Sequence, residues 1–320
     1  MSEPIPTVLR RRDALARGYT DGELRATCRS GGLRRLRPGT YLADDAFAAL
    51  DAAQLHRELI RATLPGVSAD AVVSHQSAAV LHGLPVWALP LDRVHVTRDR
   101  SGGGKRTRHL HSHPAPLPAA DVVRCDGIAV TSIARTVADL CRTVPFEAAV
   151  VVGDAGLRAA KLPATAVADA LAYAERRPGH PAARRALGFL DGRSESVGES
   201  RSRVALAALG YDVPELQASL LDADGRVLGR VDFLFAGAGV VGEFDGKIKY
   251  GKYLRDGQDP GDAVFAEKQR EDSIRDTGWE VVRWTWHDLS NPAVIDARVR
   301  RALRRRHGRP RPLGAVLRPS

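Results

Sequence analysis

Two short apolar runs around a glycine turn limit how residues 229–250 can fold. The runs are RVDFLF and VVGEF, with AGAG between them. Runs of this length bounded by glycine predict neighbouring strands of a buried sheet. Because strand side chains alternate between faces, Glu243, Asp245 and Lys247 should share one face, with Asp232 on the adjacent strand. Three charged groups in a row on a buried strand need a partner that neutralises them.

Pairing of the two strands would bring the carboxylates of Asp232 and Asp245 close together. Neighbouring carboxylates repel unless a cation neutralises them, and Mg²⁺ (or Mn²⁺) needs few protein carboxylates. Such an ion activates water and polarises a phosphate, and Lys247 would stabilise the developing negative charge. Glu199, on the preceding predicted helix, and Glu243 add further acidic groups. We therefore predict catalytic residues Asp232, Glu243, Asp245, Lys247 and Glu199, with Asp232, Asp245 and Glu243 as metal ligands.

A structural interpretation of the same residues stays open. Asp245 and Gly246 would form a simple turn, with Lys247 exposed. Glu267 lies on the next predicted helix, where a solvated helix face is the interpretation that we favour. Lys268 and Arg270, on the same helix, would face either the site or DNA.

Charge is concentrated at the two ends of the chain. The formal net charge of the 320 residues is +10. Residues 1–42 hold nine arginines and four acidic residues, and residues 298–320 hold nine arginines and no acidic residue. Basic ends around a weakly acidic middle indicate a polyanionic partner, DNA above all. Solubility and the arginine bias of a GC-rich genome are the alternative explanation.

Composition also excludes several classes of protein. No run of about 18 apolar residues exists, so we expect no membrane span and no membrane partner. The N-terminus MSEPIPTVLRRRD lacks the apolar core of a secretory signal. Cys28, Cys125 and Cys141 are odd in number and far apart, unlike a disulfide framework or a zinc site. We therefore expect a cytoplasmic protein with reduced thiols.

The first 48 residues predict a small DNA-binding unit. Two short helices are expected, the second opened by a capping box at Thr20 and Glu23, followed by a basic hairpin with Pro38 and Gly39 at its tip. This order is typical of a winged helix, in which the second helix and the wing contact DNA. A helical cap with a solvated arginine face is the alternative. The predicted DNA-binding residues are Arg25, Arg29, Arg34, Arg35 and Arg37.

The rest of the chain predicts a mixed α/β (α+β), multidomain protein. Residues 49–175 alternate helices and strands, and residues 176–194 look like a linker rich in proline and glycine. Residues 195–303 predict a helix, a strand pair, a third strand, a long helix and a closing strand ending in WTWHDL. Residues 304–320 look like a basic tail. A length of 320 residues suits two or three such domains.

Histidines in the middle region raise a second metal hypothesis. His109, His111 and His113 alternate in HLHSH and could share a strand face as metal ligands. No fourth ligand is evident nearby, and ordinary strand residues are the interpretation that we favour. His75 and His82 lie seven residues apart on one predicted helix, where packing or capping is expected.

The motifs GESRSR, RVDFLF and GEFDGKIKYG, together with the segment DAVFAEKQREDSIRDTGWEVVRWTW, resemble a domain of unknown function related to very-short-patch-repair (Vsr) endonucleases. The resemblance covers about residues 195–303 and implies a restriction-endonuclease-like, PD-(D/E)xK-type fold. In this chain Val231 stands where that motif has proline. Lys247 and Lys249 stand where the family usually has a histidine, so a Vsr-like histidine-assisted mechanism is in doubt.

The segments ARGYTDGELRA, GGLRRLRPGTYL, SHQSAAVLHGLP and VTSIARTVADL resemble AbiEi-type antitoxins of type IV toxin–antitoxin systems. This resemblance covers about residues 5–160. It implies a winged-helix transcriptional autoregulator with a mixed second domain. A cognate toxin is a further possible partner, although one sequence shows no neighbouring gene.

Two hypotheses of different classes follow. The first is a DNA-binding protein with a metal-dependent phosphodiesterase domain, an endonuclease-like enzyme. The second is a non-catalytic AbiEi-type repressor that uses the nuclease-like fold only for binding.

Overall fold

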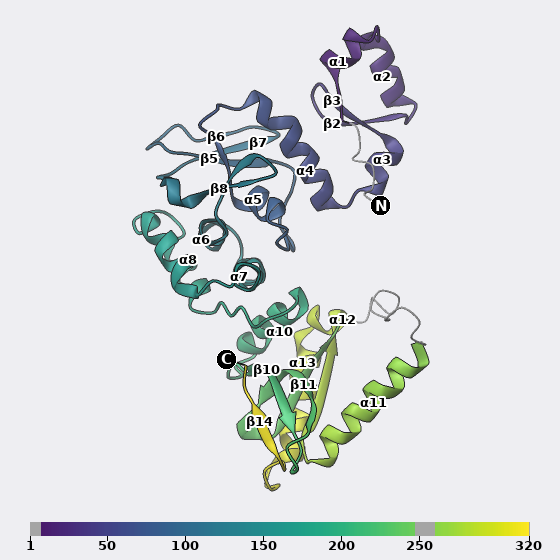
Figure 1. Cartoon of the computed structure of the whole chain (residues 1–320), viewed down its shortest axis with the longest axis vertical. Helices are drawn as coiled ribbons and strands as arrows, with labels where there is room; N and C mark the ends of the chain where they lie inside the picture. The colour runs from purple at the N-terminus through teal and green to yellow at the C-terminus, as the bar shows by residue number, and fades with distance from the viewer. Residues whose placement is uncertain (1–7, 247–259, 320) are drawn as a thin grey trace. The chain divides into compact units, whose positions relative to one another are not determined.

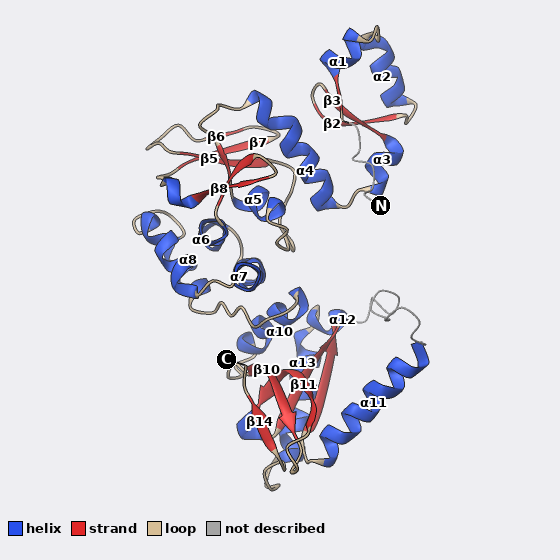
Figure 2. Cartoon of the chain, in the orientation of Figure 1, coloured by secondary structure: helices blue, strands red, loops and turns tan. Residues whose placement is uncertain are grey.

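The structure, a computed structural model, describes residues 8–246 and 260–319. It is mixed α/β, with three β-sheets distributed over two compact units, Met1–Leu190 and Asp191–Ser320 (Figures 1 and 2). No helix within the described ranges is long and apolar enough to cross a membrane.

The chain begins with a small three-stranded sheet in the order β1-β3-β2. Its elements are β1 (Leu9–Arg10), α1 (Arg11–Ala16), α2 (Asp21–Arg29), β2 (Leu33–Arg37), β3 (Thr40–Ala43) and α3 (Asp44–Ala49). The predicted capping box at the start of α2 is confirmed, because Thr20 and Glu23 each accept from the other's backbone N–H. The predicted hairpin is also confirmed, with β2 and β3 antiparallel. Ala14, Leu24 and Tyr41 form its buried core.

A six-stranded sheet follows, in the order β6-β7-β5-β4-β9-β8. Its strands are β4 (Val72–Val73), β5 (Val94–Arg98), β6 (Lys105–Arg106), β7 (Leu110–Pro114), β8 (Val122–Cys125) and β9 (Ile128–Thr131). The helices around it are α4 (Ala52–Thr63), α5 (His75–Leu81), α6 (Ile133–Thr143), α7 (Phe146–Ala160), α8 (Ala164–Leu171) and α9 (His180–Leu187). Leu59 and Ile60 of α4 pack against Val94 and Val96 of β5, so α4 covers one face of this sheet.

The predicted linker over residues 176–194 differs from what the structure shows. Residues 180–187 form α9, whose Ala183 and Ala186 are buried with α6, α7 and α8. Pro178 and Gly179 fit the start of this helix, since Gly179 has the positive φ of 85° that a glycine tolerates. Ala183 and Ala186, which lie among prolines and arginines in the sequence, are the residues that indicate a packed helix here.

The second unit is built on a five-stranded sheet in the order β13-β12-β11-β10-β14. Its strands are β10 (Glu215–Leu221), β11 (Val227–Phe235), β12 (Val240–Asp245), β13 (Glu280–Thr285) and β14 (Ala315–Leu317). The helices are α10 (Val197–Ala208), α11 (Pro260–Asp276), α12 (Trp286–Leu289) and α13 (Pro292–Arg306). Buried residues of α10, α12 and α13 pack on one sheet face, and Ile274 of α11 packs on the other.

Two boundaries of this unit differ from the prediction. The predicted basic tail contains β14, which pairs antiparallel with β10 through Leu317 and Val316. The closing strand ends at Thr285, because Thr285 and Asp288 form a capping box that starts α12 at Trp286. An apolar WTW sequence does not reveal that cap.

Close contact between α10 and β12 sets the position of Glu199. A Cβ atom on Gly198 would lie 1.9 Å from Cε1 of Phe244, so only glycine lets the helix approach the strand this closely. Trp284 adds a buried link, because its Nε1–H donates to Ser202 Oγ of the same helix at 2.7 Å.

We predict that Gly198→Ala destabilises the chain by about 1–3 kcal/mol, the usual cost of overpacking a core. Alanine normally stabilises a helix interior relative to glycine, so the sign of the effect isolates the contact with Phe244. Urea unfolding followed by fluorescence measures it. Gly237→Ala is the control, because no atom lies within 4 Å of its added Cβ, and a stability of Gly198→Ala equal to that control would contradict the account.

Candidate active site

The antiparallel pair β10–β11 changes its packing at one cross-strand position. Leu216 and Phe233 belong to the core on the α10 side, whereas Ala218 and Val231 belong to the core on the α11 side. Residues two apart on a regular strand share a face, so both strands switch faces between these pairs. Gln217 and Asp232 lie at the position where the two strands change faces, between the cross-strand pairs Leu216↔Phe233 and Ala218↔Val231.

Gln217 has the unusual backbone that this switch requires. Its φ is +55°, a conformation uncommon for a residue with a side chain, and it is 6% exposed. Strained backbone inside a core persists only where the surroundings fix it, and such residues concentrate at functional sites. The Gln217 side chain donates from Nε2 to Glu199 Oε2 at 2.9 Å.

Asp232 is held among other acidic groups. Its Oδ2 accepts the backbone N–H of Phe244 at 2.8 Å. Burial and the nearby carboxylate of Glu199 raise the pKa of Asp232 to about 7, with Glu243 adding to the shift and hydrogen bonds from Phe244 and Gln217 opposing it. A buried carboxyl group whose pKa is raised by two other carboxylates is a position where a cation would be favourable.

Glu199 has two functions in the structure. Its carboxylate accepts from Ser196 Oγ at 2.8 Å and from the backbone N–H of Glu195 at 2.7 Å, which closes the first turn of α10. The same carboxylate reaches Gln217 on β10. Glu199 is 8% exposed, so it contributes a buried negative charge next to Asp232 as well as a helix cap.

Glu243 is paired with two arginines. Its Oε1 lies 2.6 Å from Nη2 of Arg270 on α11, and its Oε2 lies 2.7 Å from Nη2 of Arg283 on β13. Glu267 joins the same network by accepting from Arg270 at 2.8 Å and from Arg283. The side chain of Glu267 is 42% exposed, so this solvated face of α11 also takes part in the ion-pair network. Glu243 serves here as the anchor of an ion-pair network that fixes α11 to the sheet.

Asp245 ends β12 two residues beyond Glu243 and pairs in register with Thr285. Alternation places it on the same strand face as Glu243. Lys247, the predicted fifth catalytic residue, lies outside the described residues. The structure thus brings Glu199, Asp232 and Glu243 together from α10, β11 and β12, and Asp245 lies two residues beyond Glu243 at the end of β12.

The donor set suits a hard cation that uses few protein ligands. Within the described ranges the acidic side chains form no group of three whose oxygens lie within 4.8 Å of one another. Mg²⁺ is commonly bound through one or two carboxylates and keeps several waters. Asp232, whose carboxylate accepts the backbone N–H of Phe244, fits this mode better than Glu243, both of whose oxygens are paired with arginines.

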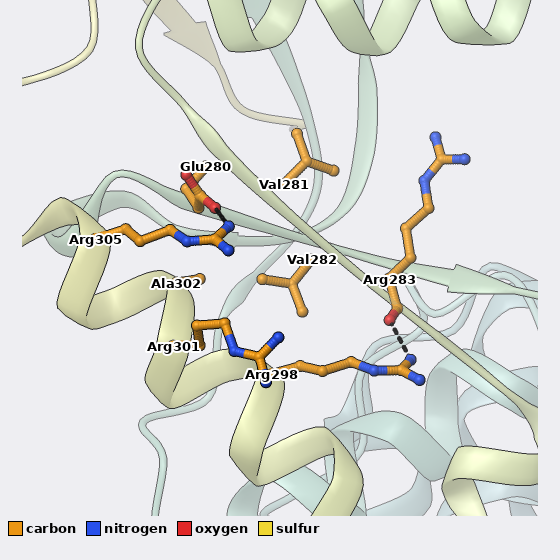
Figure 3. A pocket seen from close by; sticks show the side chains of 8 residues that line it. All are labelled: Glu280, Val281, Val282, Arg283, Arg298, Arg301, Ala302 and Arg305. Carbon is orange, nitrogen blue, oxygen red and sulfur yellow. Dashed lines mark hydrogen bonds and ion pairs between the residues drawn. The ribbon is translucent and has the colours of Figure 1, made fainter.

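An arginine-lined cavity lies elsewhere on the same unit. It has a volume of about 140 Å³ between β13 and α13 (Figure 3). Arg305 pairs with Glu280 at 2.6 Å, and Arg298 donates to the carbonyl oxygen of Arg283 at 2.8 Å. Figure 3 shows the guanidinium of Arg283 pointing away from this cavity. None of the predicted acidic site residues lines it.

The predicted DNA-binding arginines separate into two groups. Arg25 and Arg29 on α2 and Arg35 on β2 are exposed. Arg34 is also exposed but pairs with Asp44 at 2.5 Å.

Arg37 has a structural contact instead. It donates from Nη1 to the carbonyl oxygen of Ala62 on α4 at 2.9 Å, in a partly buried position. That bond fastens the hairpin to α4.

Sequence reasoning missed Gln217 and Arg283. Gln217 is a large polar side chain between Leu216 and Ala218 of ELQASLL, and its position opposite Asp232 was a usable signal. Arg283 is recognisable only from the parallel register that places it beside Glu243, because β13 follows β12 by more than 30 residues.

Comparisons with known proteins give distant matches. No family model matches the chain. Two uncharacterized proteins of Mycobacterium tuberculosis, MT2308 and Rv2248, are each 29% identical over 191 residues, 58% of this chain. The match spans 66% of the length of these relatives. The crystal structure of the RV2827C protein from Mycobacterium tuberculosis has a TM-score of 0.37 and 16% identity, covering 62% of this chain and 75% of that one.

We predict that Asp232 makes the stability of residues 191–320 fall as pH rises. Its folded pKa of about 7 exceeds the ordinary value of 3.8. Between these pH values the unfolded chain has released the proton that the folded chain keeps, so stability is lost, by up to about 4 kcal/mol. In the presence of a chelator, Asp232→Asn should remove this loss and be more stable than the wild type at pH 8.

Thermal unfolding at pH 5 and pH 8 measures the difference. Asp224→Asn, at an exposed position in the turn between β10 and β11, is the matched control and should keep the wild-type pH dependence. Equal pH dependence in Asp232→Asn and the wild type would contradict the assignment.

Proposed function

We propose that this chain is a DNA-binding protein whose residues 191–320 form a metal-dependent phosphodiesterase of the PD-(D/E)xK type. The observation that supports it is the meeting of Glu199, Asp232 and Glu243, brought by a helix and two adjacent strands to one buried location. The acidic residues occur in the order expected for that type of nuclease. One lies on a helix, the next on a strand, and the sequence Glu-x-Asp ends the following strand.

The side chains have separate roles in this proposal. Asp232 and Asp245 hold Mg²⁺ or Mn²⁺, while Glu243 ties Arg270 and Arg283 in place. The bound ion supplies Lewis-acid activation of a water and of the phosphodiester. Gln217 orients the carboxylate of Glu199. Arg270 is paired directly with Glu243. A guanidinium at that position would stabilise the scissile phosphate.

The N-terminal segment supplies the DNA contact in this proposal. Helix α2 presents Arg25 and Arg29, and the β2–β3 hairpin presents Arg34 and Arg35. A helix followed by a basic hairpin suits a winged-helix unit that places α2 in the major groove and the hairpin on the backbone. Arg37 lies on the same strand β2 and also donates to the carbonyl oxygen of Ala62.

One observation favours the second candidate function. Both oxygens of Glu243 are engaged by arginines, so an ion-pair network occupies part of the predicted metal site. A repressor of AbiEi type could keep such a network for stability and use residues 191–320 for binding alone.

We predict Mg²⁺- or Mn²⁺-dependent cleavage of DNA that Asp232→Asn and Asp245→Ala reduce by at least about 100-fold, the scale of a lost electrostatic contact in a transition state. Plasmid and linear duplexes with and without chelator measure it. Asp224→Asn, in the exposed turn, is the control and should cut like the wild type. DNA binding without cleavage by the wild type would favour the repressor instead.

We predict that Arg25→Ala and Arg29→Ala weaken DNA binding at all sequences and flatten its salt dependence. Each lost phosphate contact should reduce the slope of log K against log salt by about 0.9. Fluorescence anisotropy of a labelled duplex over a salt series measures both quantities.

Arg124→Ala is the matched control for charge, because Arg124 is an exposed arginine on β8. It should change neither the affinity nor the slope. Identical effects of Arg124→Ala and Arg25→Ala would show that net charge, not α2, governs binding.

A further inference from the structure

A cluster of histidines lies in the first unit, away from the residues used above. His95 on β5 alternates with Val94 and Val96, which belong to the core beneath α4, so His95 lies on the opposite face of the sheet. His111 of β7 pairs in register with His95, and His113 follows two residues later on the same face. His75, the first residue of α5, completes the set.

The rings are packed against one another. The centroids of His75 and His113 are 3.9 Å apart with the rings stacked, and those of His111 and His113 are 3.8 Å apart. His95 Nδ1 lies 3.0 Å from His113 Nε2. One ligand nitrogen each from His75, His95 and His113 lies within 4.8 Å of the others.

His109 does not belong to this cluster, although the sequence groups it with His111 and His113. It precedes β7, and α5 and β5 contribute His75 and His95 in its place. Ser74 is the N-cap residue of α5, but its side chain forms no capping hydrogen bond. Its Oγ lies 2.9 Å from His75 Nδ1 instead.

The second nitrogen of His75 points to a missing ligand. His75 is 2% exposed, and its Nε2 has no hydrogen-bond partner among the described residues. The backbone at His75 has a φ of +52°, a costly conformation that delivers the ring to this position. In the tautomer in which Nδ1–H donates to Ser74 Oγ, Nε2 carries the lone pair that would bind a metal, and Ser74 is the outer partner that orients the ring.

We propose that His75, His95 and His113 bind one divalent transition metal ion of the Zn²⁺ class and thereby fasten α5 to β5 and β7. Three histidines at tetrahedral Zn–N distances have nitrogens about 3.3 Å apart, close to the separation of His95 and His113. The rings of His75 and His113 are stacked 3.9 Å apart at 17°, so binding requires one of them to rotate until its in-plane lone pair points at the ion. The fourth coordination position is left for water.

The protonation of the cluster is compatible with a metal. Burial, together with the other histidines and arginines, lowers the pKa of His75 well below its ordinary value and that of His95 to about 3. Burial also lowers the pKa of His113 and His111. Neutral imidazoles need not release a proton to bind an ion.

The charged groups around the cluster are arginines with their own partners. Arg135 pairs with Asp121 and Asp139, and Arg93 pairs with Asp92. Arg142 donates to the carbonyl oxygen of Pro178, and Arg106 lies on the exposed edge strand β6. Their positive field opposes a cation, which selects for a metal that forms strong bonds to nitrogen over Mg²⁺ or Ca²⁺.

Metal analysis of the full-length chain tests the proposal. After saturation with Zn²⁺ and gel filtration, the wild type should retain about one zinc per chain. His113→Gln and His95→Gln should lose it, with affinity reduced by at least about 100-fold. His109→Gln is the neighbouring-histidine control, and Asp232→Asn excludes the carboxylate site; both should retain the metal.

A second measurement guards against misfolding of the variants. Chelator-treated wild type and His109→Gln should gain thermal stability when Zn²⁺ is added back, and Co²⁺ in place of Zn²⁺ should give the visible absorption of nitrogen-ligated cobalt. His113→Gln, with a native circular dichroism spectrum, should show neither change. Absence of stoichiometric metal in the wild type, or equal zinc in His109→Gln and His113→Gln, would overturn the proposal and leave a neutral hydrogen-bonded histidine chain.

Discussion

Repulsion among buried carboxylates is the constraint on which residues 191–320 depend. Burial and the nearby carboxylates of Glu199 and Glu243 raise the pKa of Asp232. The chain offsets this with Gln217, with the backbone N–H of Phe244 and with two arginines. The strained backbone of Gln217, the tight approach of α10 at Gly198 and the packing of α11 all serve that arrangement.

Much of the local structure was predictable from sequence. The capping box at Thr20, the hairpin at Pro38 and Gly39 and the strand pair around AGAG rest on short-range signals, and the structure contains all three. The mixed α/β class followed from the same signals. Helix α9 and strand β14 were missed because proline- and arginine-rich sequence concealed small buried side chains and a pairing partner nearly 100 residues away.

The candidate site was predictable only in part. Alternation along β12 predicts that Glu243 and Asp245 share a face, but the arginine partners of Glu243 come from a helix and a parallel strand that lie later in the chain. Arg37 looked like the other basic residues of the hairpin until α4 supplied a carbonyl oxygen for it. The histidine cluster was hidden for the same reason, since His75 and His95 approach His113 through the sheet and not through sequence spacing.

Five described residues other than glycine have positive φ, and two of them, His75 and Gln217, lie in the two buried polar clusters. In both cases the backbone conformation brings a polar side chain to a buried position beside titratable groups. Backbone strain that packing does not require is a reason to look for a ligand. The two clusters differ in chemistry: oxygen ligands suit Mg²⁺, and imidazoles suit zinc-like metals.

The titration of the Asp232 carboxyl carbon, followed by ¹³C NMR with and without Mg²⁺, tests the central claim most directly. Without metal the carboxyl should titrate near the raised pKa of about 7. Saturating Mg²⁺ should lower that pKa by about 1–3 units, the effect of an opposite charge within a few ångströms. A titration that Mg²⁺ leaves unchanged would contradict a cation site at Asp232.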